Sequence, residues 1–571
     1  MTNFNKILFL FSRKQKKILA ILSIFIFFCL FLEMLSLAFI VPVFNIIFVE
    51  QSSWVNLFIA DTEFLKSKNF KIIILTTLVL VFFIKNIFLI ILNYFTLKFY
   101  SSIQLEISNK LFLQHLDQTE DIVLEKKSEN LIRKIIGDSD GVKNYLVCYH
   151  NLFIELFFIF LLFLLLFFYN YKITIFFTLT FLIIISCYIK VIKKRINKWA
   201  NDYQSSLGEI QNIVIEGIRG IKDIIIYNLE KFFFIYFDGI NKKKISNFYR
   251  LDFMNTVQRF WMEIFAIFGI VTPLIIYIYF NKPINELIPI FALFSASLFR
   301  ILPSFNKIIN HYNTIKFYQP SLDVVYAQFF NFNPSINFEK SNHNIYFKDS
   351  FSLKNVTFFY NKNSFKVLNQ VNLVFFKGKC SLILGENGSG KSTLLNIISG
   401  LIKPNEGKIF VDENISIYEN KLSWLKKISY VQQNIFLLNK SIKENIVLNF
   451  DNKYDLASYN KIIKLLFLDQ AFQNFPNKLD SVVGVDGMNL SGGQRQLISI
   501  ARALYKNGEI FLFDEPSSAL DYDYQRILKQ VINFLKDNRK TIVIITHDIT
   551  LFKEFADSIY KINSGSVIKQ S

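Results

Sequence analysis

The sequence predicts a helical membrane domain of six spans followed by an α/β domain. The chain has 571 residues, is 52% hydrophobic and contains 66 Phe, which is too apolar for a purely soluble protein of this length. Long apolar runs fill the first half, whereas short apolar strands, helical stretches and glycine turns alternate in the second. The expected parts are a membrane domain at 1–330, a polar linker at 331–344 and an α/β domain at 345–571.

Six apolar runs are each long enough to cross a hydrocarbon core of ~30 Å, which needs about 20 helical residues. They lie at 18–47, 70–97, 150–169, 173–192, 260–280 and 286–306. Short turns at 170–172 and 281–286 join two pairs of spans into hairpins. The stretch 52–70, with an interfacial tryptophan, is expected to be a short surface helix or a plain connecting loop.

The net charge of +19 is distributed around the apolar spans and forms no single patch. This pattern is typical of a membrane protein with positively charged cytosolic segments and argues against nucleic acid as a partner. The long polar segments 98–149 and 193–259 and the N-terminus are therefore expected in the cytosol. The four cysteines are scattered, which predicts neither a zinc site nor a disulfide framework.

The stretch "GENGSGKS" at 385–392 fits the phosphate-binding pattern G-x-x-x-x-G-K-[ST]. An apolar strand run at 380–384 precedes it and a helix-forming run at 393–401 follows, which makes a chance match the weaker alternative. Backbone N–H groups and the helix N-terminus would hold phosphate oxygens. Lys391 would reach the terminal phosphates and Ser392 would offer its hydroxyl to Mg²⁺. The predicted nucleotide-binding residues here are Gly385, Glu386, Asn387, Gly388, Ser389, Gly390, Lys391, Ser392 and Thr393.

The stretch "IFLFDE" at 510–515 is an apolar strand that ends in two carboxylates. Asp514 is placed to hold Mg²⁺ through water, and Glu515 to polarise the attacking water. The alternative is the solvated end of an ordinary strand.

The stretch "LSGGQ" at 490–494 resembles the signature motif of ATP-binding-cassette (ABC) proteins, and the block 345–571 is similar to that family throughout. The resemblance implies that Ser491, Gly492, Gly493 and Gln494 bind the γ-phosphate of an ATP held by a second cassette.

Further residues match the family in chain order. The resemblance implies that Tyr360 stacks on adenine, that Gln433 contacts Mg²⁺ and water, and that His547 contacts the γ-phosphate. Lys391, Glu515 and His547 would be the catalytic residues, and Ser392, Gln433 and Asp514 the metal ligands. The pattern departs from the family at Val485, where many exporters carry an acidic residue.

Six spans ahead of one cassette resemble the exporter type of ABC half-transporter, which implies ATP and Mg²⁺ as cofactors and a second copy of the chain as partner. The stretch 207–230 resembles the helix after the second cytosolic coupling loop. The implied location is the bacterial inner (plasma) membrane, multi-pass, with the N-terminus and the ATPase domain in the cytosol.

Two stretches, 32–44 and 298–326, resemble bacterial lipid-linked oligosaccharide flippases and surface polysaccharide exporters. The implied function is ATP-driven export or flipping of an amphiphilic substrate, a lipid-linked oligosaccharide or glycolipid. The alternatives are an exporter of a lipid A-like lipid, a drug or a peptide, and a regulatory or channel-like ABC protein.

Arg300 and Glu33 are the candidate substrate residues. Arg300 follows Glu286 by 14 positions, which is about 21 Å along the sixth span. It would pair with the diphosphate of a lipid-linked sugar, or snorkel to the inner interface near a helix break at Pro303. Glu33 and Glu263 are expected to line a hydrated cavity, and Lys85 to pair with a carboxylate or to snorkel.

Overall fold

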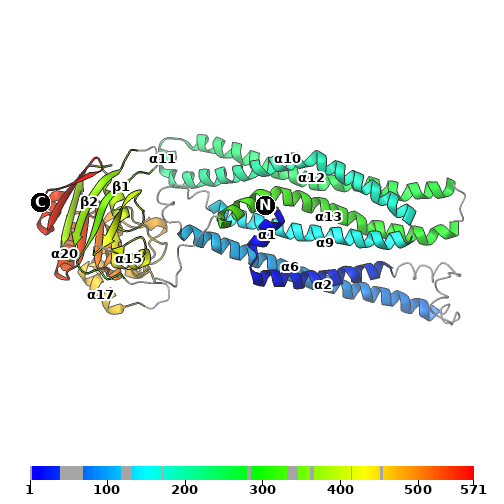
Figure 1. The fold of residues 1–571 in the computed structure, drawn as a ribbon, viewed down its shortest axis with the longest axis horizontal. Helices are drawn as coiled ribbons and strands as arrows, with labels where there is room; N and C mark the ends of the chain where they lie inside the picture. The colour runs from blue at the N-terminus through cyan, green and yellow to red at the C-terminus, as the bar shows by residue number, and fades with distance from the viewer. Residues whose placement is uncertain are drawn as a thin grey trace. The chain divides into compact units, whose positions relative to one another are not determined.

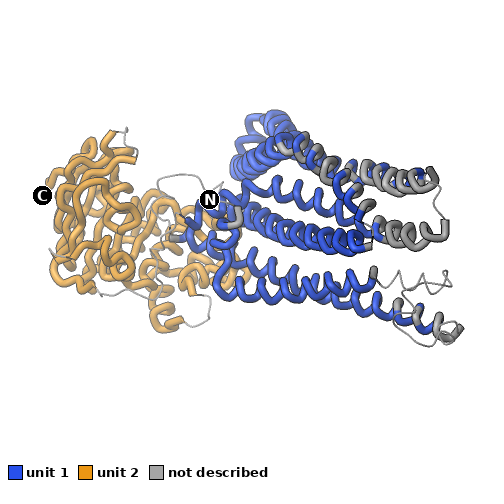
Figure 2. The backbone as a smooth tube through the Cα atoms, turned by 45° about the vertical axis from the view of Figure 1, so that its right-hand side comes forward, with its two compact units in different colours: residues 1–116, 127–333 blue, residues 117–126, 334–571 orange. Residues whose placement is uncertain are grey.

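The computed structural model divides the chain into two compact units, which Figure 2 colours separately: residues 1–116 with 127–333, and 117–126 with 334–571. The expected linker at 331–344 and most of the expected outer segment at 52–70 lie outside the described residues. The structure describes 3–38, 68–117, 132–169, 171–279, 284–330, 345–360, 365–412, 415–449 and 454–570.

Six long helices are found among the described residues of the first part of the chain, and each contains most or all of one predicted span (Figure 1). They are α2 (Arg13–Ala38), α6 (Lys68–Asp117), α9 (Ser139–Tyr169), α10 (Tyr171–Arg219), α12 (Glu230–Tyr279) and α13 (Ile284–Phe330). Shorter elements accompany them: α1 (Asn3–Leu10), α11 (Ile221–Ile226) and a π-helix at Arg133–Asp138. Residues 39–47 of the first predicted span are not among the described residues.

Among the described residues, three segments are long and apolar enough to cross a bilayer: Arg13–Ser36, Leu75–Leu116 and Arg133–Phe168. Helix α2 shows how such a helix is built. Ile26 and Leu30 are buried on one face, whereas Phe25, Phe28 and Phe31 are exposed on the other. An exposed face this apolar is suited to lipid, because hydrocarbon replaces water as the solvent there.

Helix α13 is continuous through Pro303, so the predicted break at this residue is wrong. Proline removes one backbone donor and disfavours a helix interior. Buried contacts on both sides of the proline offset this cost, because Phe305 and Ile309 pack against residues of α9 and α13. Proline is also better tolerated in membrane-type helices than in soluble ones.

The stretch 207–230 is not one helix. Helix α10 ends at Arg219, Gly220 separates it from the short α11, and a turn with Asn228 at φ 51° leads to α12. Glycine is a poor helix former, which explains why the chain breaks here although the flanking residues have helical spacing.

Besides the small cluster at Phe305 and Ile309, the described helices of the first unit pack around two larger apolar clusters. The larger one joins α1, α2, α6, α9 and α13, with Cys29, Ile103, Val142, Phe158 and Leu322 among its buried members. The smaller one joins α10, α12 and α13 through Ile196, Ala200, Leu251 and Phe317. Figure 1 shows α10 and α12 running side by side, as this cluster requires.

The described part of the second unit contains two β-sheets. One is antiparallel, in the order β2-β1-β4-β5. The other has the order β10-β9-β3-β8-β7-β6, with β10 antiparallel to β9 and the remaining pairs parallel. The first sheet comprises β1 (Ser350–Phe358), β2 (Leu368–Phe376), β4 (Glu406–Val411) and β5 (Ile415–Ser416); the second comprises β3 (Cys380–Gly385), β6 (Ile428–Val431), β7 (Ile510–Asp514), β8 (Thr541–Thr546), β9 (Ser558–Asn563) and β10 (Ser566–Lys569).

The central parallel strands β7 and β8 are apolar on both faces, because each face packs on a separate core. In β7, Phe511 and Phe513 join one core while Ile510 and Leu512 join the other. Strand β8 alternates in the same way. The helices of this unit are α14 (Lys391–Ile398), α15 (Lys421–Lys427), α16 (Ile442–Val447), α17 (Leu456–Leu465), α18 (Leu468–Ala471), α19 (Gly492–Lys506), α20 (Tyr522–Asp537) and α21 (Ile549–Phe552).

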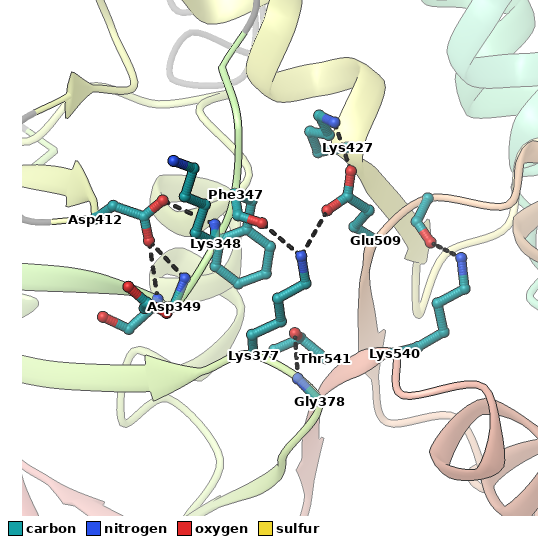
Figure 3. A network of polar contacts seen from close by, with 12 residues as sticks. Phe347, Lys348, Asp349, Lys377, Gly378, Asp412, Lys427, Glu509, Lys540 and Thr541 are labelled. Atoms are coloured by element: carbon teal, nitrogen blue, oxygen red, sulfur yellow. Dashed lines mark hydrogen bonds and ion pairs between the residues drawn. The ribbon is translucent and has the colours of Figure 1, made fainter.

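A polar network fixes the start of this unit to its sheets (Figure 3). The Asp412 carboxylate accepts hydrogen bonds from the backbone N–H groups of Lys348, Asp349 and Ser350. Partial burial acts to raise the pKa of Asp412, but these three donors outweigh it and hold the pKa below its ordinary value. Nearby, Glu509 accepts from Lys427 and lies 3.6 Å from the Lys377 ammonium.

Candidate nucleotide site and membrane cavity

The predicted nucleotide residues converge because four neighbouring strands run parallel. Strands β3, β8, β7 and β6 are adjacent in this order, so their carboxyl ends meet at one edge of the sheet. Ligands of open α/β sheets bind at this edge. The phosphate-binding loop follows β3, His547 follows β8, Glu515 follows β7 and Gln433 follows β6.

The loop 385–390 has the backbone conformation that phosphate binding requires. Gly390 has φ 100°, and a Cβ atom there would lie 2.8 Å from the Val367 carbonyl oxygen, so only glycine fits. Gly388 also has a positive φ, and a Cβ there would meet nothing within 4 Å. The loop is therefore open at Gly388, on the side where a ligand would approach.

Two polar side chains at this loop, Lys391 and Ser389, are available to bind an anion. Lys391 folds back and donates to the carbonyl oxygens of Gly385 at 2.8 Å and Glu386 at 2.9 Å. The Ser389 hydroxyl is buried and has no hydrogen-bond partner among the described residues. A phosphate group would satisfy both, since an unpaired buried hydroxyl costs about 1–3 kcal/mol. The residues present thus fit a nucleoside phosphate.

The Asp514 carboxylate is buried, and its hydrogen-bond partners are two neutral hydroxyls. Ser392 donates to Oδ1 at 3.3 Å and Tyr430 donates to Oδ2 at 3.5 Å. Burial raises the pKa of Asp514. A carboxylate beside a serine hydroxyl is a donor set suited to Mg²⁺, so the residues fit the predicted metal.

Glu515 lies at the centre of the polar cluster. Gln433 donates from Nε2 to Glu515 Oε2 at 2.8 Å, the Lys391 ammonium lies 3.9 Å from Oε1, and His547 Nδ1 lies 3.8 Å from Oε1. Glu515 also has φ 48°, a left-handed conformation that is uncommon for a non-glycine residue. Such conformations cluster at functional sites.

Tyr360 lies beside the start of α14. Its hydroxyl shares a hydrogen bond of 2.9 Å with Thr393 Oγ1, and its ring meets the edge of Phe358. The residue is 45% exposed, so the side chain is accessible to a ligand, as the adenine prediction requires.

The signature segment begins a helix. Ser491 caps α19: its hydroxyl accepts from the Gln494 N–H, and the Gln494 side chain accepts from the Ser491 N–H. Gly493 is required by packing, since a Cβ there would lie 2.7 Å from the Tyr524 ring. Gln494 also donates to the Ala471 carbonyl. The described hydrogen bonds of Ser491 and Gln494 stay within the helical half of the domain, away from the phosphate-binding loop.

Two residues of the site were missed in the sequence. Tyr430 bonds to Asp514, and Tyr524 packs against Gly493. Tyr430 lies in β6 next to β7, and the strand order that brings it to Asp514 is not visible in the sequence.

Comparison with known families agrees with this geometry. A family model described as "ABC transporter" matches residues 368–518, and one described as "ABC transporter transmembrane region" matches residues 19–302. The chain belongs to the ABC transporter family. It is a multi-pass membrane protein whose ATPase domain binds ATP and couples its hydrolysis to transport.

The transporter has relatives named "ATP-dependent lipid A-core flippase". The one from Photorhabdus laumondii is 27% identical over 419 residues, covering 72% of this chain and 70% of the relative. The one from Yersinia pestis is 25% identical over 416 residues, covering 72% and 69%. The one from Pasteurella multocida is 35% identical over 217 residues, covering 38% and 37%.

A solved structure shares the fold of the transporter over nearly its full length. The structure of a bacterial Atm1-family ABC exporter with ATP bound has a TM-score of 0.76, with 15% sequence identity, and the match covers 96% of this chain and 95% of that one. The predicted fold class, a six-span exporter-type membrane domain followed by an ATPase domain, is confirmed.

The membrane domain of the transporter contains a cavity of about 760 Å³ between α2, α6, α9 and α13. Glu33 and Arg300 both line it, and Arg300 Nε donates to Glu33 Oε1 at 2.7 Å. Lys85 lies 3.9 Å from the same oxygen, and the Arg300 guanidinium lies 4.5 Å from the centre of the Phe158 ring. Arg300 thus already has a carboxylate partner, which neither sequence hypothesis included, whereas Lys85 pairs as expected.

Glu263 lies elsewhere in the membrane domain. Its carboxylate accepts from Arg259 at 3.0 Å within α12, and both side chains are exposed. It is not one of the residues that line the cavity of α2, α6, α9 and α13.

Proposed function

We propose that this transporter is an ATP-driven flippase that moves an amphiphilic lipid with a sugar-bearing head group to the outer leaflet. Two independent observations support this. The relatives that match most of the chain are named as lipid A-core flippases. The cavity within the membrane domain is lined by charged and amide side chains among aliphatic ones. Charged groups are costly inside a membrane domain and commonly mark a substrate path.

The cavity lining carries the proposal. Among its described residues, Phe158 is the one aromatic hydrocarbon ring, and Glu33, Asn86, Asn93 and Arg300 are polar. Leu, Ile and Cys side chains supply the other apolar surface. Aromatic linings suit apolar drugs, and hydrogen-bonding linings suit sugars and phosphates. A phosphorylated glycolipid fits both the polar groups and the aliphatic surface of this cavity.

A lipid-linked oligosaccharide is the second candidate. Its head group also combines sugar with phosphate, and the stretches 32–44 and 298–326 resemble flippases of such lipids. The relatives favour a lipid A-like glycolipid over it. For either substrate, Arg300 would reach a phosphate by exchanging its partner Glu33 for the substrate.

ATP would be held between two copies of the chain, with the ATPase domains and the N-terminus in the cytosol. Lys391 and the loop 385–393 would bind the phosphates, and Tyr360 would stack on the adenine. Ser491 to Gln494 of the second copy would complete the site from the N-terminus of α19. A symmetric pair of this kind gives two equivalent sites.

Ser392, Asp514 and Gln433 would hold Mg²⁺, which neutralises charge on the phosphates when bound. Glu515 would accept a proton from the attacking water, with Gln433 orienting its carboxylate. His547, 3.8 Å from Glu515, would contact the terminal phosphate.

The experiment that tests the proposal is ATP-dependent flipping in proteoliposomes. The purified chain is reconstituted with a lipid A-core glycolipid, and in parallel with a polyprenyl-diphosphate oligosaccharide; the Glu515→Gln variant is the blank. Flipping of the glycolipid supports the proposal. If only the oligosaccharide lipid is flipped, the second candidate replaces the proposed substrate. ATP turnover without movement of either lipid contradicts both candidates.

A further inference from the structure

A second ion pair lines the same cavity, further along α13. Glu155 of α9 accepts a hydrogen bond from the Lys307 ammonium of α13 at 2.9 Å. Lys307 follows Arg300 by seven residues, so it lies on the same face of the helix, about 10 Å along its axis. The Arg300–Glu33 pair and the Lys307–Glu155 pair are therefore two polar stations along one wall of the cavity.

Glu155 uses only half of its carboxylate in this pair. Lys307 bonds to Oε1, whereas Oε2 is buried and has no hydrogen-bond partner among the described residues. The residue as a whole is 7% exposed. A buried acceptor without a donor is rare and costs more when it carries charge, so the free oxygen indicates a missing donor group.

The surroundings of Glu155 repeat this pattern. His150 and Asn151 of the same helix line the cavity, as does His311 of α13, one turn beyond Lys307. The His150 Nε2 atom is also buried without a partner in the described part of the chain. This end of the cavity therefore presents several hydrogen-bonding groups beside the apolar side chains of Ile154 and Phe158.

The charges of the lining argue against a simple anion trap. Two carboxylates, Glu33 and Glu155, line the cavity beside two cations, Arg300 and Lys307. With Lys85, which lies against Glu33, these groups carry one net positive charge when the histidines are neutral. A site for phosphate alone would need no buried carboxylate, because that group repels anions. A ligand that donates hydrogen bonds beside its phosphate satisfies both kinds of group.

We propose that Glu155 Oε2 accepts a hydrogen bond from a hydroxyl or amino group on the sugar of the transported lipid, while Lys307 holds the other carboxylate oxygen in place. This inference rests on the proposed flippase function and assigns a specificity residue within it. A site built around a substrate donor rejects analogues that lack the donor, since its own acceptor is then left unpaired.

The test compares two lipids on the unmodified chain and on variants of Glu155. The probes are a lipid A-core glycolipid and the same glycolipid with its sugar hydroxyl and amino groups fully methylated, so that phosphates and acyl chains match. The measurement is the lipid concentration that half-maximally stimulates ATP hydrolysis in nanodiscs. For the unmodified chain, the methylated lipid should need at least a tenfold higher concentration.

The Glu155→Gln variant keeps an oxygen for Lys307 but replaces the acceptor with an N–H₂ donor. For this variant, the concentrations of the two lipids that half-maximally stimulate ATP hydrolysis should lie within about threefold of each other. Glu155→Asp retains a carboxylate and should recover part of the discrimination. Glu263→Gln is the matched control, because Glu263 is an exposed carboxylate outside this cavity, and it should discriminate like the unmodified chain.

The outcomes separate the two proposals. If Glu155→Gln discriminates as the unmodified chain does, the Glu155 subsite is wrong while the flippase function stands. If the unmodified chain responds equally to both lipids, the subsite is also wrong. If neither lipid stimulates hydrolysis and the glycolipid is not flipped, the proposed function fails, and the subsite fails with it.

Discussion

The Gln433 amide donates a hydrogen bond of 2.8 Å to the Glu515 carboxylate, which joins the segment after β6 to the end of β7. These residues are 82 positions apart in the chain, and the parallel pairing of β6 with β7 brings them together. Glu515 therefore has an orienting partner for one oxygen, while Lys391 and His547 approach the other.

Glu515→Gln should lower ATP turnover by at least ~100-fold and leave ATP binding intact, because general-base catalysis contributes about 10²–10⁴-fold. Turnover is measured by phosphate release and binding by a fluorescent ATP analogue. Glu554→Gln is the control, since that carboxylate is exposed and pairs only with surface Lys529 among the described contacts. Turnover of Glu515→Gln within a few-fold of the unmodified chain would remove Glu515 from the catalytic role.

Gln433→Ala should lower turnover by roughly tenfold, because a hydrogen bond to a charged group contributes about 1.5–3 kcal/mol and each 1.4 kcal/mol is tenfold. The KM for ATP should change less than kcat, because Gln433 orients Glu515 and would be only one of three Mg²⁺ ligands. Gln570→Ala, an exposed glutamine near the C-terminus, serves as the control. An effect confined to KM would instead place Gln433 in ATP binding alone.

Glu33→Met should destabilise the membrane domain more than Arg300→Met or Lys85→Met. Glu33 is the shared partner of both cations, so its loss leaves two positive charges together in a largely buried site. Removing one member of a buried pair costs about 3–5 kcal/mol. Thermal unfolding in detergent gives the order of stability of the three variants. Asp238→Asn is the control, because the Asp238–Lys242 pair is exposed and should contribute under about 1 kcal/mol. Equal melting temperatures for all three membrane variants would contradict a shared buried cluster.

Asp412→Asn should destabilise the ATPase domain at neutral pH and lose this effect in acid. The folded pKa of Asp412 lies below its ordinary value, so the carboxylate contributes stability above the unfolded pKa of about 3.9. This contribution is lost as the pH falls through the lower folded pKa, where both forms of residue 412 are neutral. Denaturant unfolding at pH 7 and at progressively lower pH measures the difference between the two proteins. A difference that persists unchanged in acid would show that shape, and not charge, accounts for the role of Asp412.

The ATPase half of the fold could be predicted closely because its motifs carry geometric requirements. The run 380–384 is apolar on both faces and forms β3, and Lys391 begins α14 directly after the glycine loop. A loop that wraps a phosphate needs a strand before it and a helix after it, so the motif predicts its own surroundings. The same reasoning placed Asp514 at the end of β7.

The membrane half could be predicted only in outline, because its decisive contacts join distant parts of the chain. Arg300 and Glu33 are 267 residues apart, and no local pattern in either helix marks the other as its partner. Pro303 has a strong local signal for a break, yet α13 is continuous, because packing against neighbouring helices outweighs the lost hydrogen bond. Pairwise tertiary contacts decided these features, and they leave little trace in hydrophobic periodicity.

The contact between Gly493 and Tyr524 has a consequence for how this family of sequences can change. A methyl group at position 493 would occupy space that the Tyr524 ring already fills, so an alanine there is tolerated only after the ring becomes smaller. The two positions are thus expected to co-vary over evolutionary time, and a shortened residue 524 should act as a genetic suppressor of Gly493→Ala. Rescue of that variant by Tyr524→Leu would trace its defect to crowding in one protomer, whereas failure of rescue would trace it to the nucleotide contact itself.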